Sequence, residues 1–232
     1  MGDLTYTEFK EAVKLRHGGR TDMDSWGTSA IDYYGQWVNS AYRQLCVSNN
    51  LFGTKYRVNF RELETSTTAT TTDGTAYVAD PSDVVAVRTV YDTTNNRELD
   101  QIPWKKYLGY TDRTTSASEG DATEWTRASG YIYLHPTPGT TGDTLTIYYK
   151  KRPAELTGST ATVIGSEWDD LIVALAAYKG FRFLGDLEAA KATREECIEI
   201  LAGLMGIYND EEKSSAQNWQ PDPGYIPGRS WR

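Results

Sequence analysis

Residues 166–208 read SEWDDLIVALAAYKGFRFLGDLEAAKATREECIEILAGLMGIY. Apolar side chains recur every three or four positions over 168–181 and again over 190–208, which is the period of one face of a helix. Gly185 ends the first run, and Asp186 is placed to cap the second. Because the turn between the runs is short, the sequence predicts an antiparallel pair of helices that ends at about residue 208.

Capping motifs mark where two helices begin. Ser166-Glu-Trp-Asp169 has the spacing of a Ser-x-x-acid cap, so we expect Asp169 to act as the cap partner of the first helix of this pair. Thr5-Tyr-Thr-Glu8 has the same spacing near the N-terminus. The helix that it opens is expected to end at His17, before a Gly-Gly pair.

A further helix is expected to start near Thr28 or Ser29 and to end by Asn49 and Asn50. Its apolar positions lie three or four residues apart, at Ile31, Tyr34, Val38, Ala41 and Leu45. Packed against the C-terminal pair, the two N-terminal helices predict a four-helix bundle.

The hydrophobic period changes to that of strands between residues 51 and 153. Alternating or β-branched runs lie at 56–60, 84–91, 131–134 and 145–149. The turn-rich segment 136–143 joins the last two runs, so we expect them to be antiparallel neighbours in a hairpin. The polar stretches 65–75, with seven threonines, and 111–124 are expected to be loops, and a flat strand is the alternative for the threonine run.

These patterns predict an α+β chain: a four-helix bundle of two N-terminal and two C-terminal helices, a large antiparallel β-rich insertion and an extended C-terminal arm. The helical bundle domain is expected at 1–50 and 154–208, and the β-rich insertion domain at 51–153. The arm is expected at 209–232.

The arm combines helix breakers with large apolar side chains. Pro221, Pro223 and Pro227 fix φ and lack a backbone donor, so an extended conformation is expected. The apolar anchors of the arm are Trp219, Tyr225, Ile226 and Trp231. Because such side chains need something to bury them, the arm indicates a partner protein. The alternative is that it folds back over its own domain.

Charge and composition exclude several classes of function. The 24 Lys and Arg against 32 Asp and Glu give a net charge of −8, which argues against a sequence-independent grip on nucleic acid. The basic run 150–152 is expected to be a solvated strand end. The sequence contains no apolar run of about 18 residues and no signal pattern at its N-terminus, so neither a membrane span nor secretion is expected.

Signals for catalysis and for metals are weak. His17 at a helix end and His135 before a proline have no triad neighbours, and both are expected to be structural. Cys46 and Cys197 lack CxxC spacing and are expected to be buried free thiols. We therefore expect no enzyme, no metal and no cofactor. The 16 Tyr and 7 Trp leave three roles open: sheet packing, a protein interface or ligand stacking.

The order of elements resembles that of a known family. Two helices, a β-rich insertion that closes with YIYLHPTPG at 131–139 and LTIYYKKRPA at 145–154, a WDDLI helix at 168–172, a second helix and an extended arm are similar to the head-to-tail adaptor (connector) proteins of tailed bacteriophages. The resemblance covers almost the whole chain and rests on the order of elements more than on a motif.

The resemblance implies a structural virion protein at the head-tail interface that is made in the host cytoplasm. Twelve copies would form a ring beneath the portal protein, extend the DNA channel and meet tail or nozzle proteins, while phage DNA passes without specific binding. The residues expected to meet the portal are Trp219, Tyr225, Ile226, Arg229, Trp231 and Arg232. Two alternatives stay open: another tail-completion or fibre-attachment protein, and a carbohydrate-binding module whose aromatic side chains stack on glycans.

Overall fold

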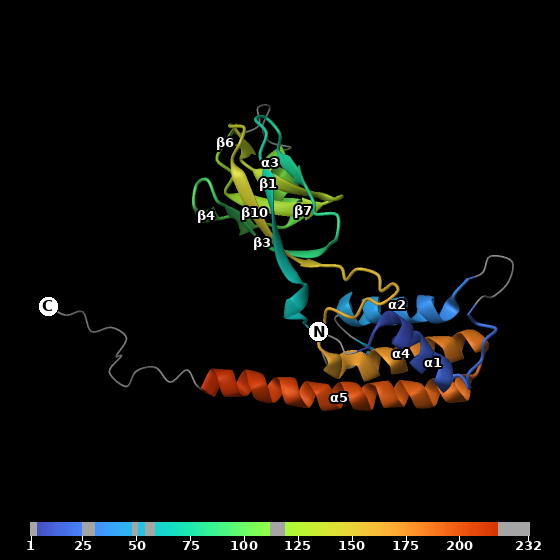
Figure 1. The fold of residues 1–232 in the computed structure, drawn as a ribbon. Coiled ribbons are helices and arrows are strands. Elements are labelled where there is room, and N and C mark those ends of the chain that lie inside the picture. Colours follow the sequence, from blue (N-terminus) through green and yellow to red (C-terminus); the bar gives the residue numbers. More distant parts are fainter. Residues whose placement is uncertain (1–3, 25–30, 48–50, 54–58, 112–118, 218–232) are drawn as a thin grey trace. The chain divides into compact units, whose positions relative to one another are not determined.

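The protein divides into two compact units, which are described separately. The structure is a computed structural model that describes residues 4–24, 31–47, 51–53, 59–111 and 119–217, with residues 207–217 described in their backbone alone. The helical unit comprises 1–58 and 155–232, and the β unit comprises 59–154. Figure 1 shows the elements of each unit.

The described part of the helical unit contains four α-helices (Figure 1): α1 (Tyr6–Arg16), α2 (Tyr33–Val47), α4 (Asp169–Leu184) and α5 (Leu187–Gln217). Helix α4 contacts each of the other three, and α1 also contacts α2. Its side chains are buried from Leu171 to Ala177 without interruption. A helix that is apolar on all sides must be surrounded, so α4 is the central element of this unit.

The predicted start of α1 is confirmed. The Thr5 backbone N–H donates to Glu8 Oε2 at 2.7 Å and the Glu8 N–H donates to Thr5 Oγ1 at 3.4 Å, which is a complete capping box. His17 is the C-cap, as expected. Helix α2 starts at Tyr33, later than expected, because the Asp32 carboxylate accepts the Gly35 N–H at 2.8 Å and caps the helix there.

The start of α4 differs from the prediction. A 3₁₀ turn (Ser166–Trp168) precedes it, and no side chain caps it. The buried Asp169 carboxylate instead accepts the backbone N–H of Leu4 at 3.0 Å. The expectation that Asp169 is a cap partner is therefore wrong: this carboxylate ties the N-terminal segment to α4. Gly185 then ends α4 in the left-handed conformation, with φ of 77°.

Helix α5 begins as predicted and ends later than predicted. Asp186 Oδ1 accepts the Ala189 N–H at 3.0 Å, so Asp186 caps this helix. The helix was expected to end at about Tyr208 but continues to Gln217. The sequence NDEEKSSAQ at 209–217 contains neither Gly nor Pro and includes several good helix formers, so it carries no stop signal. The arm residues 218–232 lie outside the described part of the chain.

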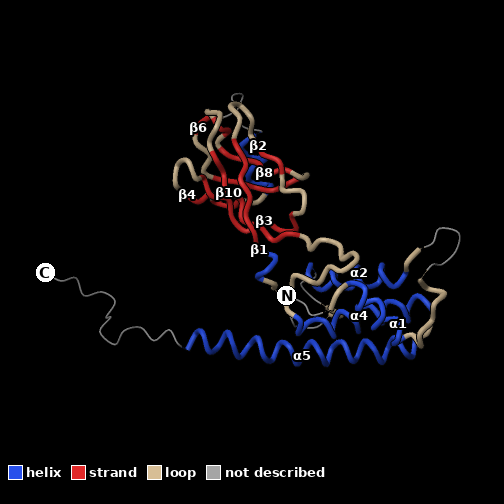
Figure 2. Tube along the Cα trace, in the orientation of Figure 1, coloured by secondary structure: helices blue, strands red, loops and turns tan. Residues whose placement is uncertain are grey.

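The described part of the β unit contains ten short strands, the helix α3 (Trp104–Thr111) and a 3₁₀ turn (Arg61–Leu63) (Figure 2). One sheet has the order β1-β10-β3-β4, with β1 (Glu64–Thr70), β10 (Thr144–Lys151), β3 (Val84–Asp92) and β4 (Arg97–Glu98). A second sheet has the order β2-β8-β7-β5, with β2 (Tyr77–Ala79), β8 (Tyr131–His135), β7 (Glu124–Ala128) and β5 (Asp100–Gln101). A parallel pair, β6 (Glu119–Gly120) and β9 (Thr137–Pro138), completes the unit.

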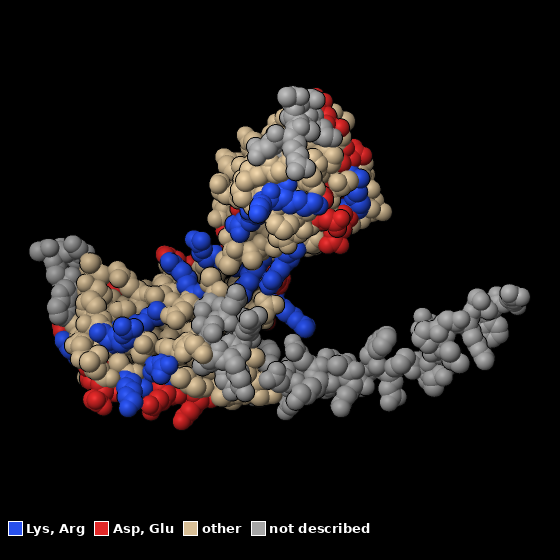
Figure 3. Space-filling model, turned by 180° about the vertical axis from the view of Figure 1, so that it is seen from behind, with Lys and Arg blue, Asp and Glu red and all other residues tan. Residues whose placement is uncertain are grey.

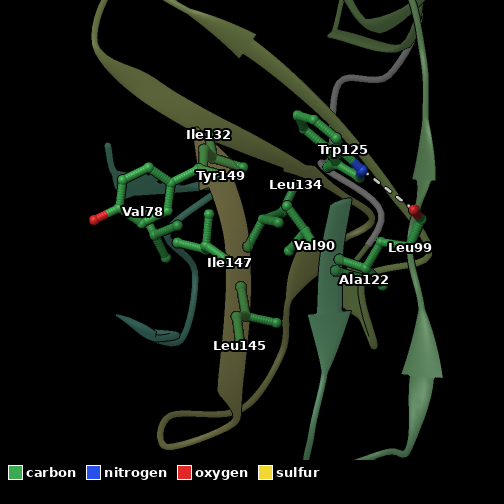
Figure 4. Packing of buried hydrophobic residues seen from close by; sticks show 10 residues of the cluster. All are labelled: Val78, Val90, Leu99, Ala122, Trp125, Ile132, Leu134, Leu145, Ile147 and Tyr149. Carbon is green, nitrogen blue, oxygen red and sulfur yellow. Dashed lines mark hydrogen bonds between the residues drawn. The ribbon is translucent and has the colours of Figure 1, made fainter. Parts of the chain in front are cut away.

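The two larger sheets share one hydrophobic core (Figure 4). It is formed by Val78, Val90, Leu99, Ala122, Trp125, Ile132, Leu134, Leu145, Ile147 and Tyr149. Trp125 is the largest of these side chains, and its indole N–H donates to the Leu99 carbonyl at 3.2 Å. The polar edge of the ring is thereby satisfied inside an apolar environment.

Several predictions for this unit are wrong. Residues 64–70 form β1, which pairs with β10 through its backbone, so the flat-strand alternative is right for this part of the threonine run, while 71–75 lie in a loop as expected. Strands β8 and β10 were expected to form a hairpin, but they lie in different sheets, because β9 in the connection pairs with β6. Lys150 was expected to be solvated but is buried within β10. The expected strand at 56–60 falls mostly outside the described residues.

Candidate partner-binding surfaces

The residues predicted to meet the partner all lie beyond the described part of the chain. Trp219, Tyr225, Ile226, Arg229, Trp231 and Arg232 belong to 218–232, so the structure does not test them. What it does describe is the helix that leads to them, up to Gln217.

Helix α5, which precedes the predicted arm, is nearly twice as long as α4. It has 31 residues against 16 in α4, or about 46 Å against about 24 Å at 1.5 Å per residue. Only Gly185 and Asp186 separate the two helices, and they pack against each other. The C-terminal part of α5 therefore extends past the beginning of α4 (Figure 1), and the described end of the helix stands clear of α4.

The side of the helical unit along α5 carries more acidic than basic side chains. Glu188, Glu195, Glu196 and Glu199 lie in the part of α5 whose side chains are described, together with Lys191 and Arg194. Figure 3 shows acidic and basic side chains along this edge of the unit. Of the four glutamates, only Glu196 pairs with a cation among the described residues, through Arg16 at 2.8 Å. An excess of carboxylates weakens binding to phosphates.

Five aromatic rings form a continuous surface on the β unit, which we call the aromatic platform: Tyr77, Trp104, Tyr107, Tyr131 and Tyr133. Tyr133 lies at its centre, with ring centroids 5.8 Å from Tyr77, 5.1 Å from Trp104 and 5.4 Å from Tyr107. Tyr131 extends the row, 4.8 Å from Tyr77. Three of the five rings are exposed: Tyr77 by 46%, Tyr131 by 41% and Trp104 by 38%.

Strand register explains why these rings meet. Tyr77 lies opposite Tyr133 and Ala79 opposite Tyr131 in the β2–β8 pair. The intervening Val78 and Ile132 point into the core, so the tyrosines point to the outer face of the sheet. Helix α3 supplies the other two rings.

Two contacts hold α3 on this face. Lys106 Nζ lies 2.6 Å from Glu124 Oε1 on β7, and this hydrogen bond raises the pKa of Lys106. The Tyr110 ring stacks on the His135 ring of β8, with 4.0 Å between the ring centroids. Helix α3 was not predicted from the sequence. The signal was Pro103, a residue suited to a first helical turn, followed by apolar residues 104, 107 and 108.

The helical unit also has a polar groove of about 560 Å³ between α2 and residues 155–157. The Asn39 side chain holds this returning segment: its Nδ2 donates to the Leu156 carbonyl at 3.1 Å and its Oδ1 accepts the Leu156 N–H at 2.7 Å. Arg43 forms an ion pair with Glu155 beside it. These polar groups bind the chain itself, so the groove has a structural role.

His17 is buried in an aromatic cluster. Its ring lies 4.3 Å from Phe181 and 5.5 Å from Trp37, and its Nδ1–H donates to the Val13 carbonyl at 2.8 Å. Burial lowers the pKa of His17, and the charge of Arg20 adds to this effect. The prediction that His17 is structural agrees with this environment.

We expect the helical unit to lose stability as the pH falls below about 6.5, the pKa of an unperturbed histidine. The folded state holds His17 neutral with a lowered pKa, so the unfolded chain binds the proton more readily. Above this pH, His17 does not change the free energy of unfolding. Below it, the free energy of unfolding falls by up to about 1.4 kcal/mol per pH unit, until the pH reaches the lowered pKa of the folded state. Urea denaturation between pH 7.5 and 5 measures the slope. His17→Gln, which cannot titrate, should flatten it, and an equal slope in both proteins would contradict the assignment.

We expect Gly203→Ala to stabilise the protein. Gly203 lies in α5, and a Cβ at this position would have no heavy atom within 4 Å. Replacing a helical glycine that has space around it should add about 0.5–1 kcal/mol to the free energy of unfolding. Thermal denaturation should show a higher midpoint, whereas an unchanged or lower midpoint would mean that this part of α5 does not gain from helix propensity.

The potential metal ligands and the two cysteines show what chemistry the described residues offer. No group of three or more His, Cys, Asp or Glu that could hold a metal ion occurs among the residues that the structure describes. Cys46 and Cys197 are buried free thiols, as predicted, and burial raises the pKa of Cys197 to about 12. Such a thiol is a poor nucleophile at neutral pH. Within 4–217, gaps excepted, no helix is both long and apolar enough to cross a membrane.

Comparison with known proteins agrees with the predicted family. No curated protein matches the chain. A family model described as SU10 adaptor protein matches residues 4–220, which include both units and the whole of α5. The match confirms the resemblance to phage adaptors, a structural class found in the virion. The chain therefore belongs to the SU10 adaptor protein family.

Proposed function

We propose that copies of this chain form a ring at the head-tail interface of a phage, beneath the portal, and that each copy docks on the portal protein through its C-terminal arm. The family match supports the adaptor role. The length of α5 supports the use of the arm, because the described helix runs past α4 and ends directly before residues 218–232.

The arm is suited to repeated, individually weak contacts. Ordering about 14 residues costs a free energy similar to that returned by burying four large apolar side chains. A single arm would therefore bind weakly. In a ring, each attachment after the first is effectively intramolecular, and the weak contacts reinforce one another. We propose a ring of twelve copies, in which the four helices form a bundle and tail or nozzle proteins bind on the side away from the portal.

The charge of the chain is compatible with a DNA channel through such a ring. The net charge of −8 and the excess of carboxylates along α5 would disfavour binding to phosphates. DNA would pass through the ring without being held by it.

Replacement of the four anchors tests this proposal. In the full-length chain, changing Trp219, Tyr225, Ile226 and Trp231 together to Ser should abolish binding to the portal protein in a pull-down. The matched control is Asp222→Asn with Ser230→Ala, which changes polar residues of the same segment and should bind as the parent does. If the anchor variant still binds the portal normally, the arm is not the docking element. A fibre-attachment protein would show this result with the portal and lose binding to a tail subunit instead.

A further inference from the structure

Strand β1 is a long sheet edge whose use the adaptor role does not explain. It has seven residues and stands at the end of its sheet, where β10 is its only strand neighbour among the described residues. The other edges of the two larger sheets are short: β4 and β5 have two residues each, and β2 has three. In the described part of the β unit, β1 is therefore the long edge with a row of free backbone donors and acceptors.

Backbone hydrogen bonds show which residues of β1 face the free side. The Thr71 N–H donates to the Asp143 carbonyl at 2.9 Å, and these two residues continue the register of the β1–β10 pair. Backbone groups of an antiparallel strand point alternately to its two sides. The odd-numbered residues of β1 therefore face β10, and the even-numbered ones direct their N–H and C=O groups to the free side. These outward residues are Glu64, Ser66, Thr68 and Thr70, of which the last three are exposed.

The sequence of β1 contains none of the devices that keep other strands from a sheet edge. Natural edges are blunted by lysines, prolines or bulges. The sequence ETSTTAT has no Lys or Pro, and its register with β10 runs without a shift. Its single charge, on Glu64, is paired with Arg88 at 2.8 Å. At the opposite edge of the same sheet, β4 consists of Arg97 and Glu98 alone. The sheet is therefore protected at β4 and open at β1.

The free edge is complementary to itself. When a second copy of β1 lies antiparallel with Thr67 opposite Thr67, Ser66 lies opposite Thr68 and Glu64 opposite Thr70. All outward residues of both strands are then hydrogen-bonded, with about eight bonds in total. Hydroxyl side chains meet across the pair and like charges do not. A shift of two residues in either direction leaves outward groups unpaired at the strand ends. We propose that β1 joins two copies of the free chain, edge to edge, in this register.

The symmetry of this pair separates it from the ring. Both copies use the same edge, so the contact is two-fold and ends at two copies. It cannot continue around a ring. The inference therefore goes beyond the proposed function and does not depend on it, because it concerns the chain in the absence of the portal. The contact is short, so pairing should depend on protein concentration.

A single cysteine tests the register. In a pair centred on Thr67, the two Thr67 Cα atoms would lie about 4.5 Å apart, within the range that a disulfide spans. The two Thr68 residues would be diagonal neighbours more than about 7 Å apart, which is too far. In the full-length chain under mild oxidation, Thr67→Cys should give at least about 10-fold more disulfide-linked dimer on non-reducing gels than Thr68→Cys. Both native cysteines are buried, so the parent chain should stay uncrosslinked.

A proline variant tests whether the edge carries the pairing. Thr68→Pro removes an outward N–H and leaves the side of the strand that faces β10 intact. The dissociation constant of the dimer, measured by analytical ultracentrifugation, should rise at least about 10-fold, because each copy loses one hydrogen bond. Thr68→Val is the matched control: it keeps the N–H and should pair as the parent does. Hydrogen exchange of β10 amides should be the same in both variants, which checks that the fold is retained.

Three results would overturn the proposal: a monomer at every concentration, equal cross-linking of the Thr67→Cys and Thr68→Cys variants, or equal dissociation constants for Thr68→Pro and the parent. A strand of the portal or of a tail protein is the alternative occupant. In that case Thr68→Pro would weaken binding to that protein while the free chain stays monomeric, which would also contradict the proposal. Failure here leaves portal docking untouched, because that depends on the four anchors and is measured with the portal.

Discussion

Replacing Trp125 with Ala should lower the free energy of unfolding of the β unit by about 4 kcal/mol. The indole is 1% exposed and lies among core residues from both sheets (Figure 4). Truncation removes its apolar contacts and leaves a cavity between the sheets. It also removes the donor of the hydrogen bond to the Leu99 carbonyl, so that a buried acceptor loses its partner.

Hydrogen exchange of β10 amides, measured by mass spectrometry, reports the stability of this unit directly. Trp104→Ala is the control, because it makes the same chemical change at a ring that is 38% exposed. We expect this control to cost less than half as much. Equal protection of β10 in the two variants would show that Trp125 is not central to the core.

Replacing Gly180 with Val should destabilise the helical unit by about 3 kcal/mol. A Cβ at this position would lie 2.7 Å from His17 Cε1 and 2.7 Å from Trp37 Cζ3, far inside van der Waals contact. Neither ring can easily move away: His17 is held by its hydrogen bond to the Val13 carbonyl, and Trp37 is almost fully buried. Gly180 therefore allows α4 to approach α1 and α2 closely.

The control for Gly180 lies in the neighbouring helix. Gly203→Val introduces the same side chain into a helix where a Cβ meets no atom within 4 Å, so its effect should be within about 0.5 kcal/mol of zero. The midpoints of urea denaturation for the two variants give the comparison. If both variants have the same midpoint, close packing at Gly180 is not what limits the substitution.

Local signals predicted the helices well where the determining contacts are close in sequence. The Thr5–Glu8 capping box, the Gly185 stop and the Asp186 cap involve neighbours at most a few residues apart. Asp169 shows the limit of such reasoning, because its partner, the Leu4 N–H, is 165 positions away. The same cap-like spacing was therefore right at residue 5 and wrong at residue 166.

The β unit was harder to predict, because register is set by contacts between distant strands. The threonine run has no hydrophobic period, and it forms a strand because β10 offers a partner. The turn residues of 136–143 suggested a hairpin, but β9 within that segment pairs with β6. The aromatic platform depends on the pairing of Tyr77 with Tyr133, 56 positions apart, which no local pattern could give.

The candidate docking residues came from the sequence alone. Helix breakers and large apolar side chains are local features of composition, so the arm could be predicted without a structure, and for 218–232 it stays a prediction. Residues 209–217, which were assigned to the arm, belong to α5 instead. The length of α5 relative to α4 required the structure, since the absence of a stop signal in 209–217 was missed.

Native mass spectrometry with the portal protein tests the central claim most directly. The full-length chain mixed with the portal should give a ring complex in which many copies of the chain are bound to one portal assembly. The variant with Ser at Trp219, Tyr225, Ile226 and Trp231 should leave the portal assembly unbound under the same conditions. An anchor variant that binds the portal with the same copy number as the full-length chain would contradict docking through the arm.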